Sequence, residues 1–354
     1  MMTNVGRPPR ALTLARVLMH AAIGLAAAVA ICVAAPLIGG NIKLAAALAN
    51  APWDSAMNPD AMIFWSTRIP RVLLGLIVGG SLALSGLIFQ AILRNPLAEP
   101  YILGISGGAA LGRMIATIIA FGGQVVFFFL APFACFAGAL VPMLILMTLA
   151  ARSRSVSTVT ILLGGVILNV FFSALILLLQ YFADLAQVRQ MFLWCMGALD
   201  IVGYTQIAVV LPIALAAFIV VACHARAMNL LSLDDGTATH LGVNVRRGVN
   251  TLLWTGSILT AAMVAVSGPI GFVGLIVPHS LRLIFGSDNR LLGPLSLIYG
   301  GVFLVVCDFI GWRGMELMQA AGMPLAQTSE IPVGVITAIL GGPFFLYLLI
   351  TRQK

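Results

Sequence analysis

Long, unbroken apolar runs constrain this chain more than any other feature of its sequence. They lie near residues 17–38, 69–93, 100–120, 126–150, 157–180, 205–224, 248–267, 271–285, 293–311 and 332–350. About 20 apolar residues cross a bilayer core as a helix, and only helices or closed barrels satisfy the backbone in lipid. Because the runs are continuous rather than alternating, we predict an all-α polytopic membrane protein with about ten transmembrane helices.

The composition agrees with a membrane protein. The 354 residues are 61% hydrophobic and 8% charged, whereas about 25% of the residues in a soluble domain are charged. We therefore predict a single transmembrane domain over residues 1–354. The first apolar run follows three basic residues, Arg7, Arg10 and Arg16, as the apolar stretch of a signal peptide does. Its length and the membrane-spanning runs in the rest of the chain favour a retained anchor helix instead.

The distribution of Lys and Arg predicts the orientation of the chain in the membrane. With a cytoplasmic N-terminus, thirteen basic residues fall inside: Arg7, Arg10, Arg16, Arg94, Arg152, Arg154, Arg226, Arg246, Arg247, Arg282, Arg290, Arg352 and Lys354. Five fall outside: Lys43, Arg68, Arg71, Arg189 and Arg313. We expect both termini to be cytoplasmic. Because the basic residues are spread over many loops, the net charge of +8 indicates topology and not nucleic-acid binding.

Two classes of energy source are disfavoured by the sequence. The two lysines, Lys43 and Lys354, complete no G-x-x-x-x-G-K-[S/T] loop, so the chain is not expected to bind ATP through a P-loop. An ion-coupled transporter is expected to carry acids near the bilayer midplane. The eleven acids fall at helix ends and in loops, and Asp308 lies nearest to the membrane interior.

The cysteines and histidines indicate no metal centre or cofactor. The five cysteines form no C-x-x-C pair and are expected to serve as packing residues: Cys32, Cys135, Cys195, Cys223 and Cys307. His279 directly follows Pro278, and we expect it to be a helix histidine bonded to backbone rather than a ligand.

One polar segment, residues 228–247 (MNLLSLDDGTATHLGVNVRR), interrupts the apolar runs on the predicted cytoplasmic side. Asp234 is a predicted N-cap, Asp235 adds negative charge at the positive end of the helix dipole, and Gly242 can end the helix. Leu231 and Leu241 are expected to be exposed. We predict two short helices that form a docking surface, with a plain interfacial linker as the alternative.

Six motifs occur together in one chain. They are RIPR (68–71), GLIFQAILRNPLAEPYILGISGGAALG (86–112), LWCMG (193–197), LSLDDGTATHLG (231–242), SGPIGFVGLIVPHSLR (267–282) and EIPVGVITAILGGPFF (330–345). Over about residues 60–350 the chain thereby resembles permease subunits of type II ATP-binding-cassette importers for vitamin B12, iron chelates and haem. The resemblance implies a homodimer in a bacterial inner membrane, two cytosolic ATPase subunits and a periplasmic substrate-binding protein. It implies no catalysis by this chain.

The resemblance also implies roles for particular residues. Six would form the ATPase-coupling helix: Leu231, Asp234, Asp235, Ala238, Leu241 and Gly242. Three would dock the binding protein: Arg68, Arg71 and Arg313. Six would lie at the cytoplasmic gate or along the pathway: Asn95, Pro96, Leu97, Gly104, Gly108 and Arg113.

Each of these roles has a structural alternative. NPLAEP also suits a plain tight turn, and a glycine every fourth residue suits helix packing. Arg68 and Arg71 share one helix face and would also suit lipid headgroups. Arg113 either snorkels to the membrane surface or lines the path. Arg313 departs from the resemblance, because the family's third arginine stands four residues after the aspartate, where this chain has Trp312.

The predicted function is import of a metal chelate from periplasm to cytoplasm. Haem is preferred because Arg113 can attract a carboxylate and the outer loop is rich in methionine, while ferric siderophore and cobalamin stay open. The alternatives are an ion-coupled secondary transporter and a membrane receptor that does not transport.

Overall fold

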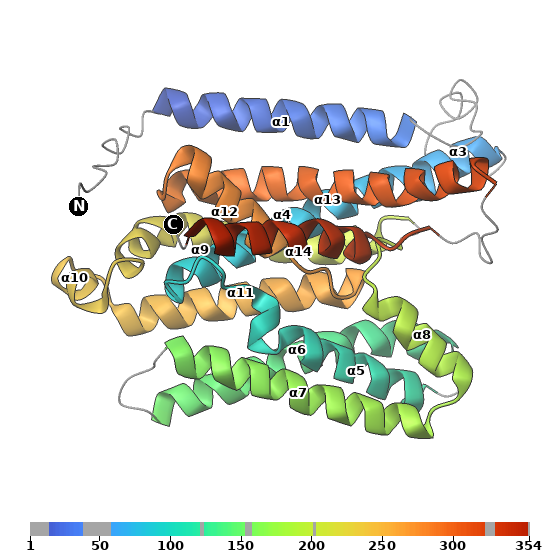
Figure 1. The fold of residues 1–354 in the computed structure, drawn as a ribbon, viewed down its shortest axis with the longest axis horizontal. Helices are drawn as coiled ribbons and strands as arrows, with labels where there is room; N and C mark the ends of the chain where they lie inside the picture. The colour runs from blue at the N-terminus through green and yellow to red at the C-terminus, as the bar shows by residue number, and fades with distance from the viewer. Residues whose placement is uncertain are drawn as a thin grey trace.

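The computed structural model describes residues 14–37, 58–120, 124–152, 158–200, 203–322 and 330–352, and within these ranges the protein has helices and no strands. Its long helices run side by side along one direction (Figure 1). The short helix α10 lies at one end of the bundle, and α3 and α8 lie at the opposite end. We refer to these as the α10 end and the α3 end.

The helices follow one another along the chain with only short connections between most of them. They are α1 (Leu14–Leu37), α3 (Pro59–Ile63), η2 (Phe64–Arg68), α4 (Ile69–Ile92), η3 (Pro100–Leu103), α5 (Ile105–Ile119), α6 (Gln124–Arg152), α7 (Thr158–Phe182), α8 (Leu185–Cys195), α9 (Thr205–Leu231), α10 (Asp235–His240), α11 (Val245–Ser267), α12 (Val273–Phe285), α13 (Asn289–Ala320) and α14 (Val333–Arg352).

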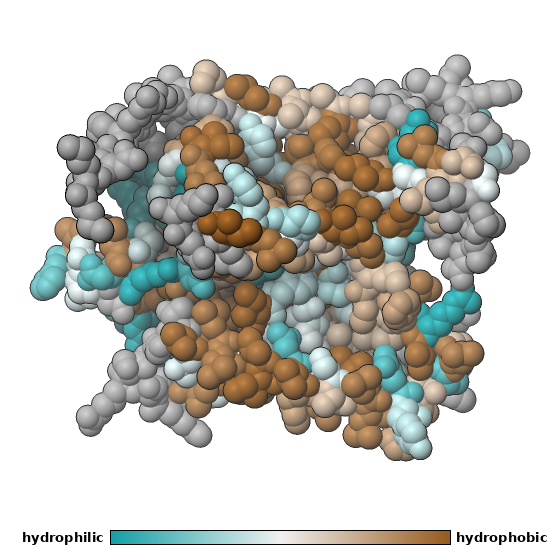
Figure 2. Space-filling model, in the orientation of Figure 1, coloured by the Kyte–Doolittle hydropathy of each residue, from teal (hydrophilic) through white to brown (hydrophobic). Residues whose placement is uncertain are grey.

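Six helices in the described residues are long and apolar enough to cross a membrane, and four shorter apolar helices accompany them. The long ones lie within Pro59–Ile92, Leu130–Leu149, Val159–Phe182, Thr205–Leu231, Val245–Ser267 and Asn289–Met315. Figure 2 shows hydrophobic side chains over much of one face, with strongly hydrophilic ones gathered mainly toward the two ends. These features confirm an all-α membrane protein, while ten membrane crossings stay a prediction.

Helix α4 forms the centre of the bundle and contacts α9, α11, α12 and α13. Within its membrane span 83% of the apolar window is buried, against 17% for α7, which therefore lies at the periphery. Glycine permits this central position. A Cβ at Gly79 would lie 2.3 Å from the carbonyl oxygen of Gly300 in α13, so the two backbones touch where a larger residue would separate them.

One predicted span differs from its expected form. The span expected at 100–120 begins with η3, breaks at Gly104 (φ 86°) and continues as α5. Gly104 is thus a left-handed cap rather than part of a helical stripe. Gly108 and Gly112 do pack closely on α6, against the backbone of Gly138 and Ala134 respectively.

The cysteines and His279 contribute no metal site among the described residues, which hold no cluster of three or more His, Cys, Asp or Glu. Cys135 and Cys307 are buried free thiols, whereas Cys195 and Cys223 are free and exposed. The side chain of Cys32 lies outside the described residues. His279 is buried within α12, next to Pro278.

Candidate functional site

The polar segment (residues 228–247) forms one short helix at the α10 end. Asp234 Oδ1 accepts a hydrogen bond from the Thr237 backbone N–H at 2.7 Å, as predicted for an N-cap. Hydrogen bonds from Thr237 lower the pKa of Asp234, so its carboxylate is ionised at neutral pH. Gly242 follows the helix with φ 82°, and the Val243 N–H donates to the Ala238 carbonyl, which ends α10 as predicted.

The leucines of this segment fall into two groups. Leu233 and Leu241, on either side of α10, are 63% and 61% exposed. Leu231 is 1% exposed, and Ala238 is also buried. The expectation that Leu231 is exposed, and that two short helices form, was wrong because α9 continues to Leu231 and turns this side chain into the bundle.

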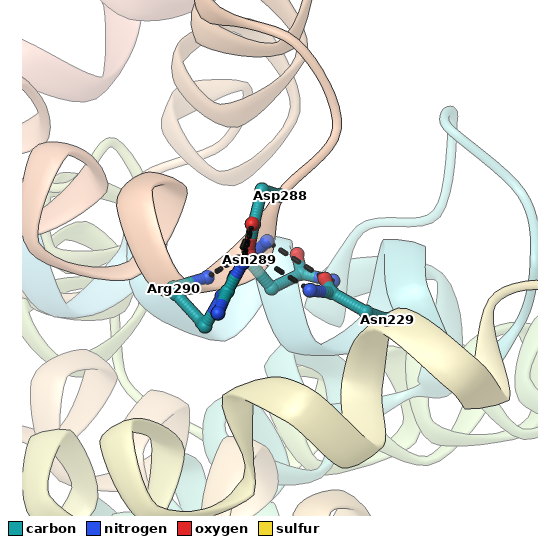
Figure 3. Close-up of polar contacts among 4 residues, drawn as sticks. All are labelled: Asn229, Asp288, Asn289 and Arg290. Atoms are coloured by element: carbon teal, nitrogen blue, oxygen red, sulfur yellow. Dashed lines mark hydrogen bonds and ion pairs between the residues drawn. The ribbon is translucent and has the colours of Figure 1, made fainter. Parts of the chain in front are cut away.

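The last turn of α9 is joined to the start of α13 by amide hydrogen bonds (Figure 3). Asn229 donates through Nδ2 to Asp288 Oδ1 at 2.8 Å, and its Oδ1 accepts from the backbone and side-chain nitrogens of Asn289, each at 2.8 Å. Arg290 Nη2 donates to Asp288 Oδ2 at 2.6 Å. Hydrogen bonds from Arg290 and Asn229 lower the pKa of Asp288 to about 2 although burial opposes this, so the acceptor is ionised at neutral pH.

The loop between α4 and η3, residues 93–99, also meets the last turn of α9. We call it the Asn95 loop. Arg94 donates through Nε to the Leu231 carbonyl oxygen at 2.8 Å. Asn95 Oδ1 accepts from the Leu97 N–H at 3.0 Å, which confirms the turn expected at Asn95. Pro96 and Leu97 follow within this turn and are half-buried.

The far end of the Asn95 loop is anchored inside the bundle. Glu99, which is 9% exposed, accepts a hydrogen bond through its carboxylate from the Phe272 N–H at the start of α12. The Tyr101 hydroxyl accepts from the Ile270 N–H, and the Tyr101 carbonyl accepts from Asn169 Nδ2 at 2.9 Å. Glu99 was not predicted as a site residue, because in the sequence it is one of eleven acids at helix ends and in loops. Its position between Pro96 and Pro100 is the sequence feature that sets it apart.

A second polar group lies at the α3 end. Arg71 pairs with Asp308 of α13 through Nε at 2.7 Å and Nη2 at 2.9 Å, and through Nη1 with Glu330. The guanidinium of Arg68 lies 5.0 Å from the centre of the Trp312 ring. These five residues, which we call the arginine cluster, line a cavity of about 180 Å³ together with residues of α1 and α3.

The arginine cluster corrects the expectation that Arg68 and Arg71 are exposed steering charges. The Arg71 side chain is 20% exposed and is neutralised by two acids of its own chain. Both arginines face α13, as residues three apart on one helix face should. Trp312, the residue that displaces the family's third arginine, is the partner of Arg68, and Arg313 is half-buried beside it.

The side chain of Arg113, in α5, lies against the last turn of α8. Its guanidinium lies 5.6 Å from the centre of the Trp194 ring of α8, a distance at which a cation is attracted to an aromatic face. Trp194 belongs to the LWCMG motif, and Arg113 directly follows the motif that ends at Gly112, so the contact brings the ends of these two motifs close together.

The ion pair at the α3 end predicts a large effect on stability. Asp308→Ala removes the carboxylate that accepts two hydrogen bonds from the mostly buried Arg71. Breaking a buried ion pair costs ~3–5 kcal/mol. We expect the melting temperature of the purified protein in nanodiscs to fall by several degrees. The double variant Arg71→Met with Asp308→Leu should be less destabilised than Asp308→Ala alone, because no buried charge loses its main partner.

The more exposed pair at the other end supplies the matched control. Arg290 is 47% exposed, so Arg290→Ala should change stability by less than about 1 kcal/mol. A melting temperature for Asp308→Ala equal to that of Arg290→Ala would contradict a structural role for the Arg71 pair.

The fold and these two polar groups define a class of protein: a helical membrane protein with exposed leucines on a polar segment at one end and a charged cluster at the other. Comparison with known proteins specifies the family. Residues 25–351 match the FecCD transport family, and the chain belongs to it. It is therefore a transport subunit, a permease of an ATP-binding-cassette importer, and the resemblance inferred from the motifs is confirmed.

Two relatives and one solved structure illustrate the family. The cobalamin import system permease protein of Halobacterium salinarum is 37% identical, over 98% of this chain and 91% of the relative. The hemin transport system permease protein of Yersinia pestis is 37% identical, over 85% of this chain and 87% of the relative. A solved metal-chelate type ABC transporter in an inward-facing conformation has a TM-score of 0.78 and 26% identity, covering 94% of this chain and 99% of that one.

Proposed function

We propose that this chain is the homodimeric permease of an inner-membrane importer that carries a metal chelate from periplasm to cytoplasm. The observation that carries the proposal is the exposure of Leu233 and Leu241 on either side of α10, at the opposite end of the bundle from the arginine cluster. A permease of this kind needs one surface for its ATPase subunits and another for substrate delivery. The α10 end is then cytoplasmic, and it is also the end at which the positive-inside rule places Arg226, Arg246 and Arg247.

The proposed partners follow from what the chain lacks and what it exposes. It has no P-loop sequence, so two cytosolic ATPase subunits would supply the energy by docking on the polar segment. Each exposed leucine buried in a partner's groove contributes ~1.5–3 kcal/mol. Asp234, Asp235 and Gly242 would shape α10, and the buried Ala238 would fix it to the bundle.

Substrate delivery is proposed to occur at the α3 end. A periplasmic binding protein would present acids to Arg68, Arg71 and Arg313, because a guanidinium binds a carboxylate through charge-assisted hydrogen bonds. Since Arg71 already pairs with Glu330, we propose that an incoming acid displaces Glu330 while Asp308 keeps its two hydrogen bonds. Docking would thus release Glu330, which is partly exposed and lies just before α14, from its ion pair with Arg71.

Passage through the membrane is proposed to follow the two-fold axis between the two copies of the chain. Asn95, Pro96 and Leu97 would form the cytoplasmic gate, and Gly104, Gly108 and Arg113 would lie along or beside the pathway. Among the substrates of the named relatives we propose haem first, because the Arg113 cation can attract a propionate. Ferric siderophore and cobalamin are the alternatives.

A transport assay tests this proposal. Proteoliposomes containing the permease and its ATPase subunits, with a binding protein outside, should accumulate haem only when ATP is present, and more than cobalamin or ferric siderophore. Loss of a charged contact at Arg113 should reduce haem uptake roughly tenfold in Arg113→Ala, while Arg113→Lys keeps most of it. Uptake of none of the three substrates would overturn the proposed function, and equal haem uptake by wild type and Arg113→Ala would overturn the preference for haem.

A further inference from the structure

The last turn of α9 is a junction between three parts of the protein. It forms the beginning of the polar segment that carries α10, it is bound to the start of α13 through Asn229, and its terminal carbonyl at Leu231 accepts a hydrogen bond from Arg94. The hydrogen bonds of Asn229 join one helix to another. Arg94 instead connects this turn to a loop, the Asn95 loop, to which the proposed function assigns the gate.

Arg94 has an unusual backbone for its residue type. Its φ is 48°, in the left-handed region that residues with a Cβ rarely adopt and that costs about 1–3 kcal/mol. Glycine or asparagine would hold the turn with less strain, so the turn alone does not require arginine. The presence of an arginine side chain at this position therefore needs a separate explanation, which the contacts of its guanidinium provide.

The tip of Arg94 lies where a helix end attracts a cation. The Leu231 carbonyl belongs to the last turn of α9, whose carbonyls lack partners within the helix and carry the negative end of the dipole. The charge of Arg94 also acts on Asp234, the N-cap of α10, and lowers the pKa of that carboxyl together with the Thr237 hydrogen bonds. One guanidinium thus interacts with the end of α9 and with the start of α10.

The opposite end of the Asn95 loop is held by different elements. Glu99 and Tyr101 bind the backbone of the turn before α12, and Asn169 of α7 binds the Tyr101 carbonyl. The loop is therefore tied to the bundle interior after residue 98 and to α9 at Arg94. Asn95, Pro96 and Leu97 lie between these two attachments, so a displacement of α9 relative to α12 acts on them.

We propose that Arg94 is a positioning residue that transmits movement of the α9–α10 segment to the Asn95 loop, so that ATPase-driven displacement of the polar segment moves the gate. The proposal rests on the proposed function of this chain as an importer permease. Without the Arg94 side chain the ATPase subunits still dock and hydrolyse ATP, but their movement of the polar segment no longer displaces the Asn95 loop.

Arg94→Gly is the informative variant, because glycine adopts φ 48° without strain and the change removes only the side chain. We expect uptake to fall roughly tenfold or more, the loss expected for one charged hydrogen bond, while ATPase activity stays within about twofold of wild type. Arg94→Lys, which keeps a donor and the charge, should restore much of the uptake. Arg226→Ala removes an exposed cation from α9 at the same end and should leave both activities unchanged.

A thiol probe reads the gate directly and needs no substrate. With Leu97→Cys in a background whose native cysteines are replaced by alanine, labelling by a membrane-impermeant maleimide is compared with and without ATP and vanadate. We expect labelling to change with nucleotide when Arg94 is present and to become independent of nucleotide in Arg94→Gly.

The outcomes separate the two proposals. Normal uptake and nucleotide-dependent labelling in Arg94→Gly would overturn the role of Arg94 and leave the importer function intact. Failure of wild type to take up any of the three chelates would overturn the proposed function, and the labelling experiment would still decide whether Arg94 links the polar segment to the Asn95 loop. Loss of ATPase docking in Arg94→Gly would also overturn the proposal, since Arg94 would then shape the docking surface.

Discussion

Gly86→Ala is expected to prevent the bundle from reaching its native packing. A Cβ at Gly86 would lie 1.8 Å from the carbonyl oxygen of Gly274 and 2.5 Å from its Cα. Both atoms belong to the backbone of α12, so no side-chain rotation relieves the clash and the two helices must move apart. Overpacking usually costs about 1–3 kcal/mol, and a clash with backbone at the central helix should reach or exceed that range.

A second glycine of the same chain provides the control for Gly86. A Cβ at Gly342, in α14, would have no atom within 4 Å, and alanine there gains about 1 kcal/mol of helix propensity. Size-exclusion chromatography of the detergent-solubilised protein should show little monodisperse Gly86→Ala and normal Gly342→Ala. If Gly86→Ala elutes and melts like wild type, the close approach of α4 and α12 is wrong.

Leu233→Asp combined with Leu241→Asp should abolish transport without unfolding the protein. Both side chains are largely exposed, so the substitutions remove no core contact. If each leucine is buried in an ATPase groove, the pair contributes ~3–6 kcal/mol to docking, and burying two carboxylates instead would add a further penalty. We expect the ATPase subunits to be lost on co-purification and ATP-dependent uptake to vanish.

The matched control for the leucine pair lies at the α3 end. Leu185, at the start of α8, is 84% exposed, so Leu185→Asp makes the same chemical change away from the polar segment and should keep ATPase association. Retained association and uptake in the Leu233 and Leu241 double variant would contradict the coupling role of α10. Leu231→Asp would not serve as a test, because its buried side chain reports on folding.

Local features of this protein could be predicted from the sequence because neighbouring residues create them. The Asp234 cap, the Asn95 turn and the glycine that ends α10 each depend on atoms within five residues along the chain. Motif order likewise identified the family, since six motifs in one chain rarely coincide without common descent.

Features that join distant segments could not be predicted in the same way. Arg71 pairs with Asp308, 237 positions later, and Arg94 meets Leu231, 137 positions later. The sequence places Arg71 near a membrane edge. That position suits an exposed arginine that docks a partner protein, and it equally suits an arginine paired with an acid of the same chain. Only the contact between α4 and α13 distinguishes these alternatives.

That this protein is an all-α membrane protein could be predicted from its sequence, because apolar runs in lipid leave the backbone no hydrogen-bond partner except its own helix. The polar segment and the caps of the short helix within it could be predicted as well. The packed bundle was needed to show which leucines are exposed, that Arg71 is neutralised, and that Arg94 and Glu99 hold the two ends of one loop. The physical reason is that burial and charge pairing depend on which helices pack together, and close backbone contacts such as Gly86 with Gly274 establish that packing across almost 200 residues.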